Sequence, residues 1–416
     1  MKRPFNYNRN KIIFYGLMGI TIVFALIWCY IDKGYPLSNI LFSDKNDTFM
    51  DFYNSLYHAG TGHPYDIKCI YPPFTYLIYS VFLYFIPENI FTMGSLEIRE
   101  NQMGMLIFVI YMIITLGIMS YLVHSNKSGK KVEKIFFLFM ILFSTPFLYT
   151  IERGNIVIVT LIFLLIFAFN YDSNNKIYRE IAIIALAMAA STKIYPAIFG
   201  LILLKEKRYK EAFRCAIYGL MIFFLPFLIF GGFEKAPLMF NNIFNAVEDF
   251  MQTGLGYKVN ISNTIKAFGR AIGLETEGYI SFANISSYIV LIISLITSLF
   301  IKEKWKVFCM LATLLVAFPN FSYTYTLIFM VIPLIMFLDK NGEPKKIDIF
   351  YALCFVGIFF PCVLNIPELF SPKGEIGMYY TLGTCIESIS IVAILFVLNI
   401  EGITSILKRR KKNGRH

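Results

Sequence analysis

The chain has 416 residues, of which 57% are hydrophobic and 16% are charged, and its mean hydropathy is +0.62. Soluble domains carry about a quarter charged residues, so this composition excludes an ordinary soluble protein and predicts a polytopic membrane protein. The net charge is +11, but the basic residues cluster in short loops and at both ends of the chain. That positive-inside pattern argues against nucleic acid as a partner and predicts that both termini are cytoplasmic.

Apolar runs recur along the chain at lengths near the ~20 residues that a membrane-spanning helix needs. They lie at about 12–31, 71–87, 103–123, 135–150, 155–170, 180–204, 213–231, 284–300, 306–320, 322–338, 348–366 and 379–399. Because lipid leaves no partner for free backbone groups, these runs must be helical. We therefore predict an all-α, polytopic integral membrane protein with about 11 to 13 transmembrane or re-entrant helices.

The predicted architecture is a single membrane domain over residues 1–416. Two larger outer loops are expected at about 32–70 and 233–283, and a basic cytoplasmic tail at about 401–416. The longest stretch between apolar runs is too short for a separate folded domain. The seven cysteines are scattered, which predicts neither a disulfide framework nor a metal cluster.

The apolar run at 180–204 contains a lysine and a proline, Lys193 and Pro196. A proline disrupts the helix that precedes it, so we expect two half-helices to meet at 191–196. Such a break also lets the basic loops on either side of this region fall on the same membrane face. Ionisable residues at membrane depth are functional candidates, with snorkelling to the interface as the alternative for Lys193.

The first predicted outer loop is rich in acids and aromatic residues. Four aspartates, Asp44, Asp47, Asp51 and Asp66, surround an aromatic run at 51–57 and a Gly-His-Pro-Tyr turn at 62–65. An amphipathic loop helix would hold the Asp51 carboxylate at the membrane surface, where it can accept a proton from a hydroxyl group. Asp47 is the second candidate base, and Asp47 with the following threonine can instead cap the loop helix. The alternative for Asp51 is a helix cap or a solvated loop acid.

Two further groups of residues follow in the first half of the chain. Tyr65 and Tyr71 are candidates for an aromatic wall against a sugar, and turn chemistry with an interfacial aromatic belt is the alternative. Arg153 and Asn155 lie between two apolar runs. An arginine at or near membrane depth must find an anion, so we expect Arg153 to bind either a lipid-linked phosphate or an internal Glu or Asp.

The later outer segments add three candidates. Asn260 and Ser262 lie in a polar stretch of the second large loop and are able to hydrogen-bond sugar hydroxyls. Tyr323 lies in a predicted outer turn, and either Tyr323 or Tyr325 is expected to line the outward cavity toward which the break at 191–196 aims Lys193.

These motifs, in this order, resemble the polytopic glycosyltransferases of family 87 (GT87), which belong to the GT-C superfamily. The motifs are Asp51, the turn at 62–65, Tyr-Pro-Pro at 71–73, Gly-Asn at 154–155, Lys-Ile-Tyr-Pro at 193–196, the basic loop at 205–210 and Asn-Ile-Ser at 260–262. The resemblance covers about residues 45–330. The chain has Arg153 where the family often has a glutamine, and it offers Tyr323 and Tyr325 where members often carry a histidine.

The resemblance implies a GT-C fold and a polyprenyl-phosphate sugar as donor, with a mannose-like hexose or a pentose as the sugar. It implies transfer with inversion to a glycan or glycolipid acceptor on the outer face, with the outer-loop aspartate as general base. The donor phosphate is then expected near Lys193 and Arg153, with no cofactor and no metal. The partners would be donor, acceptor and membrane lipids, in a bacterial cytoplasmic membrane.

Two other functions share the polytopic architecture. A transporter or flippase of lipid-linked saccharides also carries charged residues at depth, but the chain shows no internal repeat. An O-antigen polymerase or ligase is the nearest alternative among enzymes, although the first predicted outer loop has no arginine.

Overall fold

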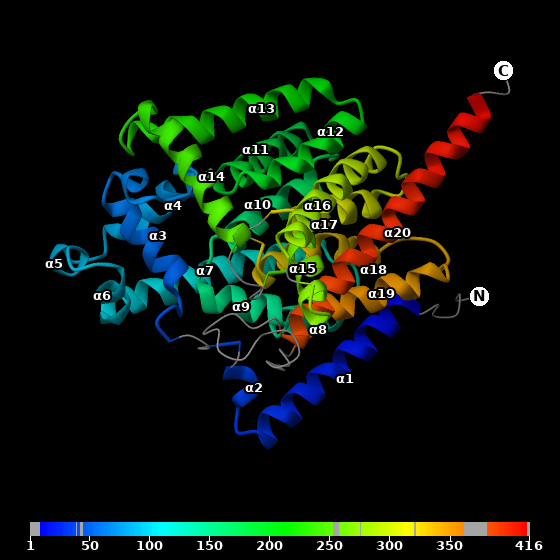
Figure 1. Cartoon of the computed structure of the whole chain (residues 1–416), viewed down its shortest axis with the longest axis horizontal. Coiled ribbons are helices and arrows are strands. Elements are labelled where there is room, and N and C mark those ends of the chain that lie inside the picture. Colours follow the sequence, from blue (N-terminus) through cyan, green and yellow to red (C-terminus); the bar gives the residue numbers. More distant parts are fainter. Residues whose placement is uncertain are drawn as a thin grey trace. The chain divides into compact units, whose positions relative to one another are not determined.

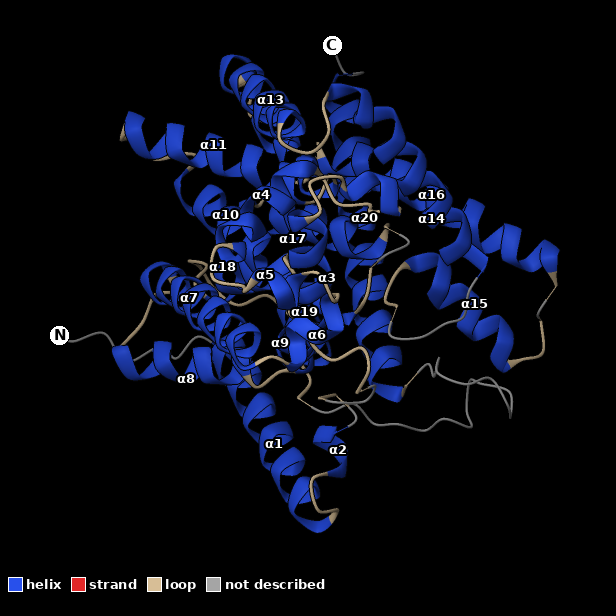
Figure 2. Cartoon of the chain, turned by 90° about the vertical axis from the view of Figure 1, so that its left-hand side faces the viewer, coloured by secondary structure: helices blue, strands red, loops and turns tan. Residues whose placement is uncertain are grey.

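The computed structural model describes residues 9–38, 40–41, 45–252, 258–274, 276–319, 322–361 and 381–413. Within these ranges every regular element is a helix and no strand is present, as Figure 2 shows. The all-α prediction is therefore confirmed. Asp44 and Cys362 lie outside the described residues, as do parts of both predicted outer loops and the end of the basic tail.

Five helical segments among the described residues are long and apolar enough to cross a membrane. They are α1 (Arg9–Ile31), α7 (Gln102–Asn126), Tyr209–Leu228, α16 (Glu277–Ser298) and Leu382–Arg409. The count rises to six if α8 (Lys131–Leu142) and α9 (Thr145–Arg153), which are bent by 60°, form one span. The chain is thus a multi-pass membrane protein. Other apolar helices are shorter than the ~20 residues of a full crossing, so the number of crossings stays a prediction.

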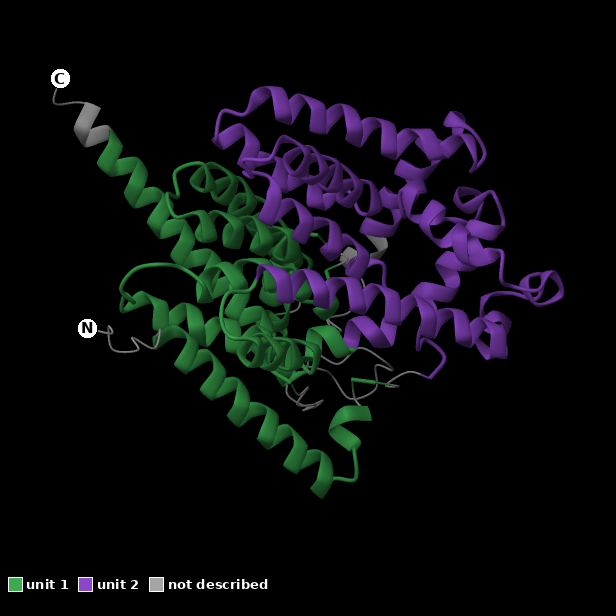
Figure 3. Cartoon of the chain, turned by 180° about the vertical axis from the view of Figure 1, so that it is seen from behind, with its two compact units in different colours: residues 1–41, 127–148, 254–416 green, residues 42–126, 149–253 purple. Residues whose placement is uncertain are grey.

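The chain divides into two compact units, each assembled from segments that are distant in sequence (Figure 3). Unit 1 comprises residues 1–41, 127–148 and 254–416, and unit 2 comprises residues 42–126 and 149–253. The prediction of a single membrane domain stays a prediction.

Unit 1 is a helical bundle in which α1 packs against α8 and α19, and α20 packs against α16, α17 and α19. Its further helices are α2 (Tyr35–Ser38), α15 (Ile261–Ala271), α17 (Lys304–Ala317), the 3₁₀ helix η5 (Thr324–Met330), α18 (Val331–Leu338), α19 (Ile347–Ile358) and α20 (Leu382–Asn413). The buried Lys127 ammonium pairs with Asp339. A buried charge needs such a partner, because desolvation otherwise costs several kcal/mol.

Unit 2 contains α10, α11 and α13, which pack side by side (Figure 1). Its helices, apart from α7, are α3 (Met50–Gly60), α4 (Pro73–Leu83), α5 (Glu88–Phe91), α6 (Ser95–Glu100), α10 (Val157–Asn170), α11 (Lys176–Thr192), α12 (Leu201–Lys205), α13 (Tyr209–Phe224) and α14 (Ala236–Gln252). Its 3₁₀ helices are η1 (Pro64–Ile67), η2 (Tyr195–Gly200), η3 (Leu225–Leu228) and η4 (Phe233–Lys235).

The loop helix predicted around Asp51 is α3, and its sequence explains how it is seated. Phe52, Leu56 and Ala59 recur at positions i, i+4 and i+7 and form one buried face. The Phe52 ring lies 4.9 Å from the Tyr111 ring, in an aromatic core. Burying a side chain of this kind contributes about 1.5–3 kcal/mol. The face fixes the rotation of α3, and Asp51 lies next to it.

The helix break predicted at 191–196 is present. α11 ends at Thr192, Lys193 has an extended backbone, and the 3₁₀ helix η2 begins at Tyr195. Pro196 has no backbone N–H, so it cannot donate the hydrogen bond that would continue α11 to the carbonyl of Thr192. That carbonyl instead accepts from the Thr75 hydroxyl of α4 at 2.7 Å.

Candidate active site

The Asp51 carboxylate is held by two donors from the turn that follows α9. Arg153 Nη2 lies 2.6 Å from Asp51 Oδ1, and Asn155 Nδ2 lies 2.7 Å from Asp51 Oδ2. The Asp51 side chain is only 20% exposed. Because each carboxylate oxygen can accept more than one hydrogen bond, both oxygens remain able to accept from another donor.

Arg153 also pairs with Asp47 and so joins two carboxylates. Its Nη1 pairs with Asp47 Oδ2, and its Nη2 lies 3.1 Å from Asp47 Oδ1. The expected pairing of Arg153 with an internal acid is thus present, and its binding of a lipid-linked phosphate stays a prediction. The Asp47 side chain is 50% exposed, whereas the Arg153 side chain is 14% exposed.

The alternative that Asp47 and Thr48 cap the loop helix is wrong. The N-cap residue of α3 is Phe49, which has a left-handed backbone (φ 64°) and no capping side-chain hydrogen bond. The Phe49 N–H donates to the Glu152 carbonyl at 2.7 Å, and Thr48 Oγ1 donates to Glu152 Oε1 at 3.1 Å. The residues before α3 are therefore bound to the end of α9.

Gly154 makes the turn between Arg153 and Asn155 feasible. Its φ of 63° lies in the left-handed region, which glycine adopts without a steric penalty. A Cβ at this position would come within 2.9 Å of the Phe108 ring and of Phe52 Cβ. The close packing against these rings brings the side chains on both sides of Gly154 to the same carboxylate.

Asn155 connects Asp51 to Tyr71. Its Oδ1 accepts from the N–H of Val157 at the start of α10, which orients its Nδ2 toward Asp51 and, at 3.3 Å, toward Tyr71 Oη. Burial raises the pKa of Tyr71, and the nearby Asp51 carboxylate raises it further, so the hydroxyl stays protonated. Tyr65 Oη in turn donates to the Tyr71 carbonyl at 3.2 Å.

Lys193 belongs to the same site. Its Nζ lies 5.0 Å from the centre of the Tyr71 ring and 5.9 Å from that of Tyr195. It is 7% exposed and interacts electrostatically with Asp51. A cation over an aromatic face is attracted by the ring, and the attraction grows when water is excluded.

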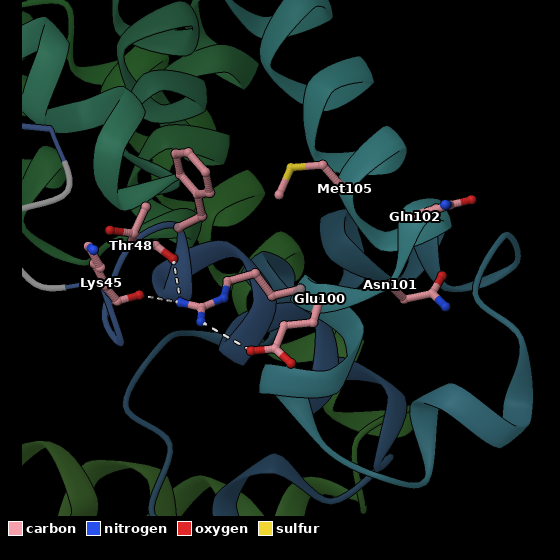
Figure 4. A pocket seen from close by; sticks show the side chains of 8 residues that line it. Lys45, Thr48, Glu100, Asn101, Gln102 and Met105 are labelled. Carbon is pink, nitrogen blue, oxygen red and sulfur yellow. Dashed lines mark hydrogen bonds and ion pairs between the residues drawn. The ribbon is translucent and has the colours of Figure 1, made fainter.

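Arg99 of α6 is a site residue that sequence reasoning missed. Its guanidinium lies against the backbone of the segment before α3, and Figure 4 shows Lys45 and Thr48 of that segment at the pocket that Arg99 also lines. Its Nη1 donates to the carbonyls of Lys45 at 2.8 Å and of Asn46 and Thr48 at 3.2 Å each. It lines a cavity of about 550 Å³. These contacts join residues more than 50 positions apart, so no local sequence pattern predicts them.

Three predicted residues lie in unit 1, near one another. Lys258 and Tyr323 form an isolated antiparallel β-bridge. Asn260 caps α15 by accepting from the Asn263 N–H at 2.8 Å, and Ser262 Oγ donates to Asn284 Oδ1 at 2.5 Å. A role for Asn260, Ser262 and Tyr323 toward sugar stays a prediction.

The structure thus brings together the predicted site residues of unit 2: Asp47, Asp51, Tyr65, Tyr71, Arg153, Asn155 and Lys193. Over the described part of the chain, no group of three or more His, Cys, Asp or Glu side chains is placed to hold a metal ion. The expectation that the site needs no metal stays a prediction.

Comparison with known proteins gives one family. The family model of glycosyltransferase family 87 matches residues 70–325, which is more than half of the chain. The match includes Tyr71, Arg153, Asn155 and Lys193 and begins after Asp51. No curated protein and no solved structure matches the chain. The membrane spans and this family match together establish that the chain belongs to glycosyltransferase family 87 and is a multi-pass membrane glycosyltransferase.

Proposed function

We propose that this glycosyltransferase moves a mannose-like hexose or a pentose from a polyprenyl-phosphate donor to a hydroxyl group of a glycan or glycolipid. Transfer takes place at the outer face of a bacterial cytoplasmic membrane, with inversion at the anomeric carbon. The observation that carries the proposal is a mostly buried carboxylate, Asp51, held on both oxygens. The Lys193 cation lies over the ring of Tyr71, whose hydroxyl accepts from the same Asn155 amide that holds Asp51.

Asp51 acts as the general base. The acceptor hydroxyl donates its hydrogen bond to a carboxylate oxygen and transfers its proton there as the hydroxyl oxygen attacks the anomeric carbon. Arg153 and Asn155 hold the carboxylate in one orientation during this step. A positioned general base typically contributes about 10²–10⁴ in rate.

Asp51 is a better base than Asp47 on geometric grounds. The Asp47 side chain is half exposed, and among the described residues it is held by Arg153 alone. The Asp51 side chain is less exposed and accepts from a neutral amide as well as from Arg153. Asp47 therefore serves to hold Arg153 in place, and Asp51 meets the acceptor.

Lys193 acts on the leaving group. As the bond between the anomeric carbon and the phosphate oxygen breaks, its electron pair remains on that oxygen and polyprenyl phosphate departs. A fixed ammonium near this oxygen stabilises the growing negative charge, and removing such a group typically costs about 10²–10³ in rate. A single displacement of this kind inverts the anomeric centre.

A transfer assay with purified protein in detergent tests the donor class. The donors are radiolabelled polyprenyl-phosphate mannose, polyprenyl-phosphate arabinose and the nucleotide-linked forms of the same sugars, with a lipid extract as acceptor. We expect transfer from a polyprenyl-phosphate donor and about 10²–10³-fold slower transfer by Lys193→Met. Lys68→Met, which changes an exposed loop lysine, is the matched control and should transfer at the wild-type rate.

Two results would contradict the proposal. One is transfer from the nucleotide-linked sugars alone. The other is movement of lipid-linked saccharide across vesicle membranes by the reconstituted protein without any new glycosidic bond, which would support a transporter.

A further inference from the structure

A strongly basic pocket lies at the end of α11 that is remote from Lys193. It has a volume of about 720 Å³ and is formed by the start of α11, the turn after α12 and the start of α13. Six of its lining side chains are basic: Lys176, Arg179, Lys207, Arg208, Lys210 and Arg214. The candidate active site does not use any of them.

The acids in this pocket are engaged by the arginines. Arg214 pairs with Glu180 at 2.8 Å, and Glu211 pairs with Arg208 and, at 3.6 Å, with Arg179. With six basic and two acidic side chains, the lining carries a formal charge of +4.

The three lysines of the pocket supply the uncompensated charge. Lys176, Lys207 and Lys210 are exposed. They make no side-chain hydrogen bond or ion pair with any residue that the structure describes. Two helices, α11 and α13, also begin at this pocket, and the positive end of a helix dipole favours an anion.

An apolar groove continues from the basic pocket between α11, α12 and α13. Its volume is about 960 Å³, and Tyr209 lines both hollows. Small residues such as Ala190, Ala216 and Gly219 on the facing helices leave this space open. α13 belongs to a candidate membrane span. An anionic group followed by an acyl chain therefore fits the two hollows, whereas a free phosphate ion would use only the first.

The pocket and the candidate active site lie at opposite ends of one helix. α11 has 17 residues, which corresponds to about 25 Å at 1.5 Å per residue, close to the ~30 Å of a hydrocarbon core. The basic loop at 205–210 is predicted to be cytoplasmic. The pocket is thus expected at the cytoplasmic headgroup level, on the face opposite to glycosyl transfer.

We propose that this pocket binds the phosphate headgroup of an anionic phospholipid of the cytoplasmic leaflet, with an acyl chain in the adjacent groove. Basic residues at an anionic membrane surface favour such lipids, and basic pockets between helices on this side bind phosphate headgroups. The site is separate from the donor site.

Native mass spectrometry of the full-length protein in neutral detergent tests this inference. The probes are phosphatidylglycerol, phosphatidylcholine, inorganic phosphate and polyprenyl phosphate. The pocket variant is Lys176→Gln/Lys207→Gln/Lys210→Gln. The matched control is Lys302→Gln/Lys346→Gln/Lys408→Gln, which removes the same charge from exposed lysines outside the pocket.

We expect phosphatidylglycerol to bind the wild type at least about tenfold more tightly than phosphatidylcholine. The pocket variant should lose about tenfold or more in affinity for phosphatidylglycerol, since each lysine near the surface contributes to headgroup attraction. The control should bind like the wild type. Replacing the same pocket lysines by arginine should preserve binding, which separates lost charge from lost folding.

Three outcomes would overturn the inference. The first is equal phosphatidylglycerol affinity in the pocket variant and the control. The second is displacement of phosphatidylglycerol by equimolar inorganic phosphate, which would make the pocket a site for the free ion. The third is a strong preference for polyprenyl phosphate over phosphatidylglycerol that disappears in the pocket variant.

Discussion

At the scale of single residues, Asn155 links the carboxylate of the candidate base, Asp51, to the hydroxyl of Tyr71. Its amide is oriented by the backbone of α10, and its Nδ2 reaches both Asp51 and Tyr71. A hydrogen bond to a charged group typically contributes about 1.5–3 kcal/mol. Losing it frees one carboxylate oxygen and so weakens the alignment of Asp51 with the acceptor.

We predict that Asn155→Ala transfers sugar about 10- to 100-fold more slowly than wild type, mainly through kcat. The measurement is the steady-state rate of transfer with the donor that the purified protein accepts. Asn126→Ala is the control, because within the described part of the chain the Asn126 amide bonds only the Leu122 carbonyl of its own helix. Equal rates for Asn155→Ala and the control would show that the amide does not orient the base.

The sequence indicated several site residues individually but not their contacts. Lys193 was a candidate because an ionisable residue within an apolar run is often functional, and Asp51 because its carboxylate lies beside aromatic residues in an acid-rich loop. For Arg153 the sequence left two partners open, a lipid-linked phosphate and an internal acid such as Asp47. The role of Arg99 was not foreseeable, since its bonds to the carbonyls of the Asp47 segment depend on how α6 packs.

At the scale of the elements, the break after α11 places Lys193 in the site. Pro196 leaves the Thr192 carbonyl without its helical donor, and the Thr75 hydroxyl replaces that donor. Thr160 Oγ1 lies 2.8 Å from Thr192 Oγ1 and ties the same residue to α10. Hydroxyls from two neighbouring helices thus fix the residue that precedes Lys193.

Thr75→Val tests this arrangement with a side chain of the same shape. Leaving the buried Thr192 carbonyl unpaired should lower the free energy of unfolding by about 1–3 kcal/mol. Chemical denaturation in detergent measures the change. Ser80→Ala is the control on the same helix, because among the described residues its hydroxyl bonds only the Tyr76 carbonyl one turn earlier. It should change stability by less than about 0.5 kcal/mol.

If Thr75→Val is as stable as Ser80→Ala, the helix break after α11 does not depend on the α4 hydroxyl.

The break itself was predictable, because a lysine and a proline interrupt a long apolar run. The partner on α4 was not, since a threonine in an apolar helix commonly bonds its own backbone.

At the scale of the whole molecule, the composition predicted the fold class but not the path that the chain takes through it. The hydrophobic fraction and the lengths of the apolar runs led to an all-α membrane protein. The division into two units with interleaved segments has no local signal, because it depends on contacts between distant helices. Several apolar helices are too short for a simple crossing, such as α4 and α10, so hydropathy alone does not fix the number of crossings.

Unit 2 combines the candidate base, the break at Lys193 and the basic pocket. Helix α11 connects the last two, with the candidate active site at its C-terminal end and the basic pocket at its N-terminal end. The two proposals therefore put glycosyl transfer and phospholipid binding at opposite ends of the same helix.

The most direct test of the account is the transfer rate of Asp51→Asn relative to wild type, with equal amounts of folded protein. We predict a fall of about 10²–10⁴-fold. Asp66→Asn is the matched control. Asp66 follows α3 in the same predicted outer loop and pairs with Lys235, and its loss should change the rate by less than about twofold, since exposed ion pairs contribute little. Transfer by Asp51→Asn at the rate of Asp66→Asn would contradict the assignment of Asp51 as the base.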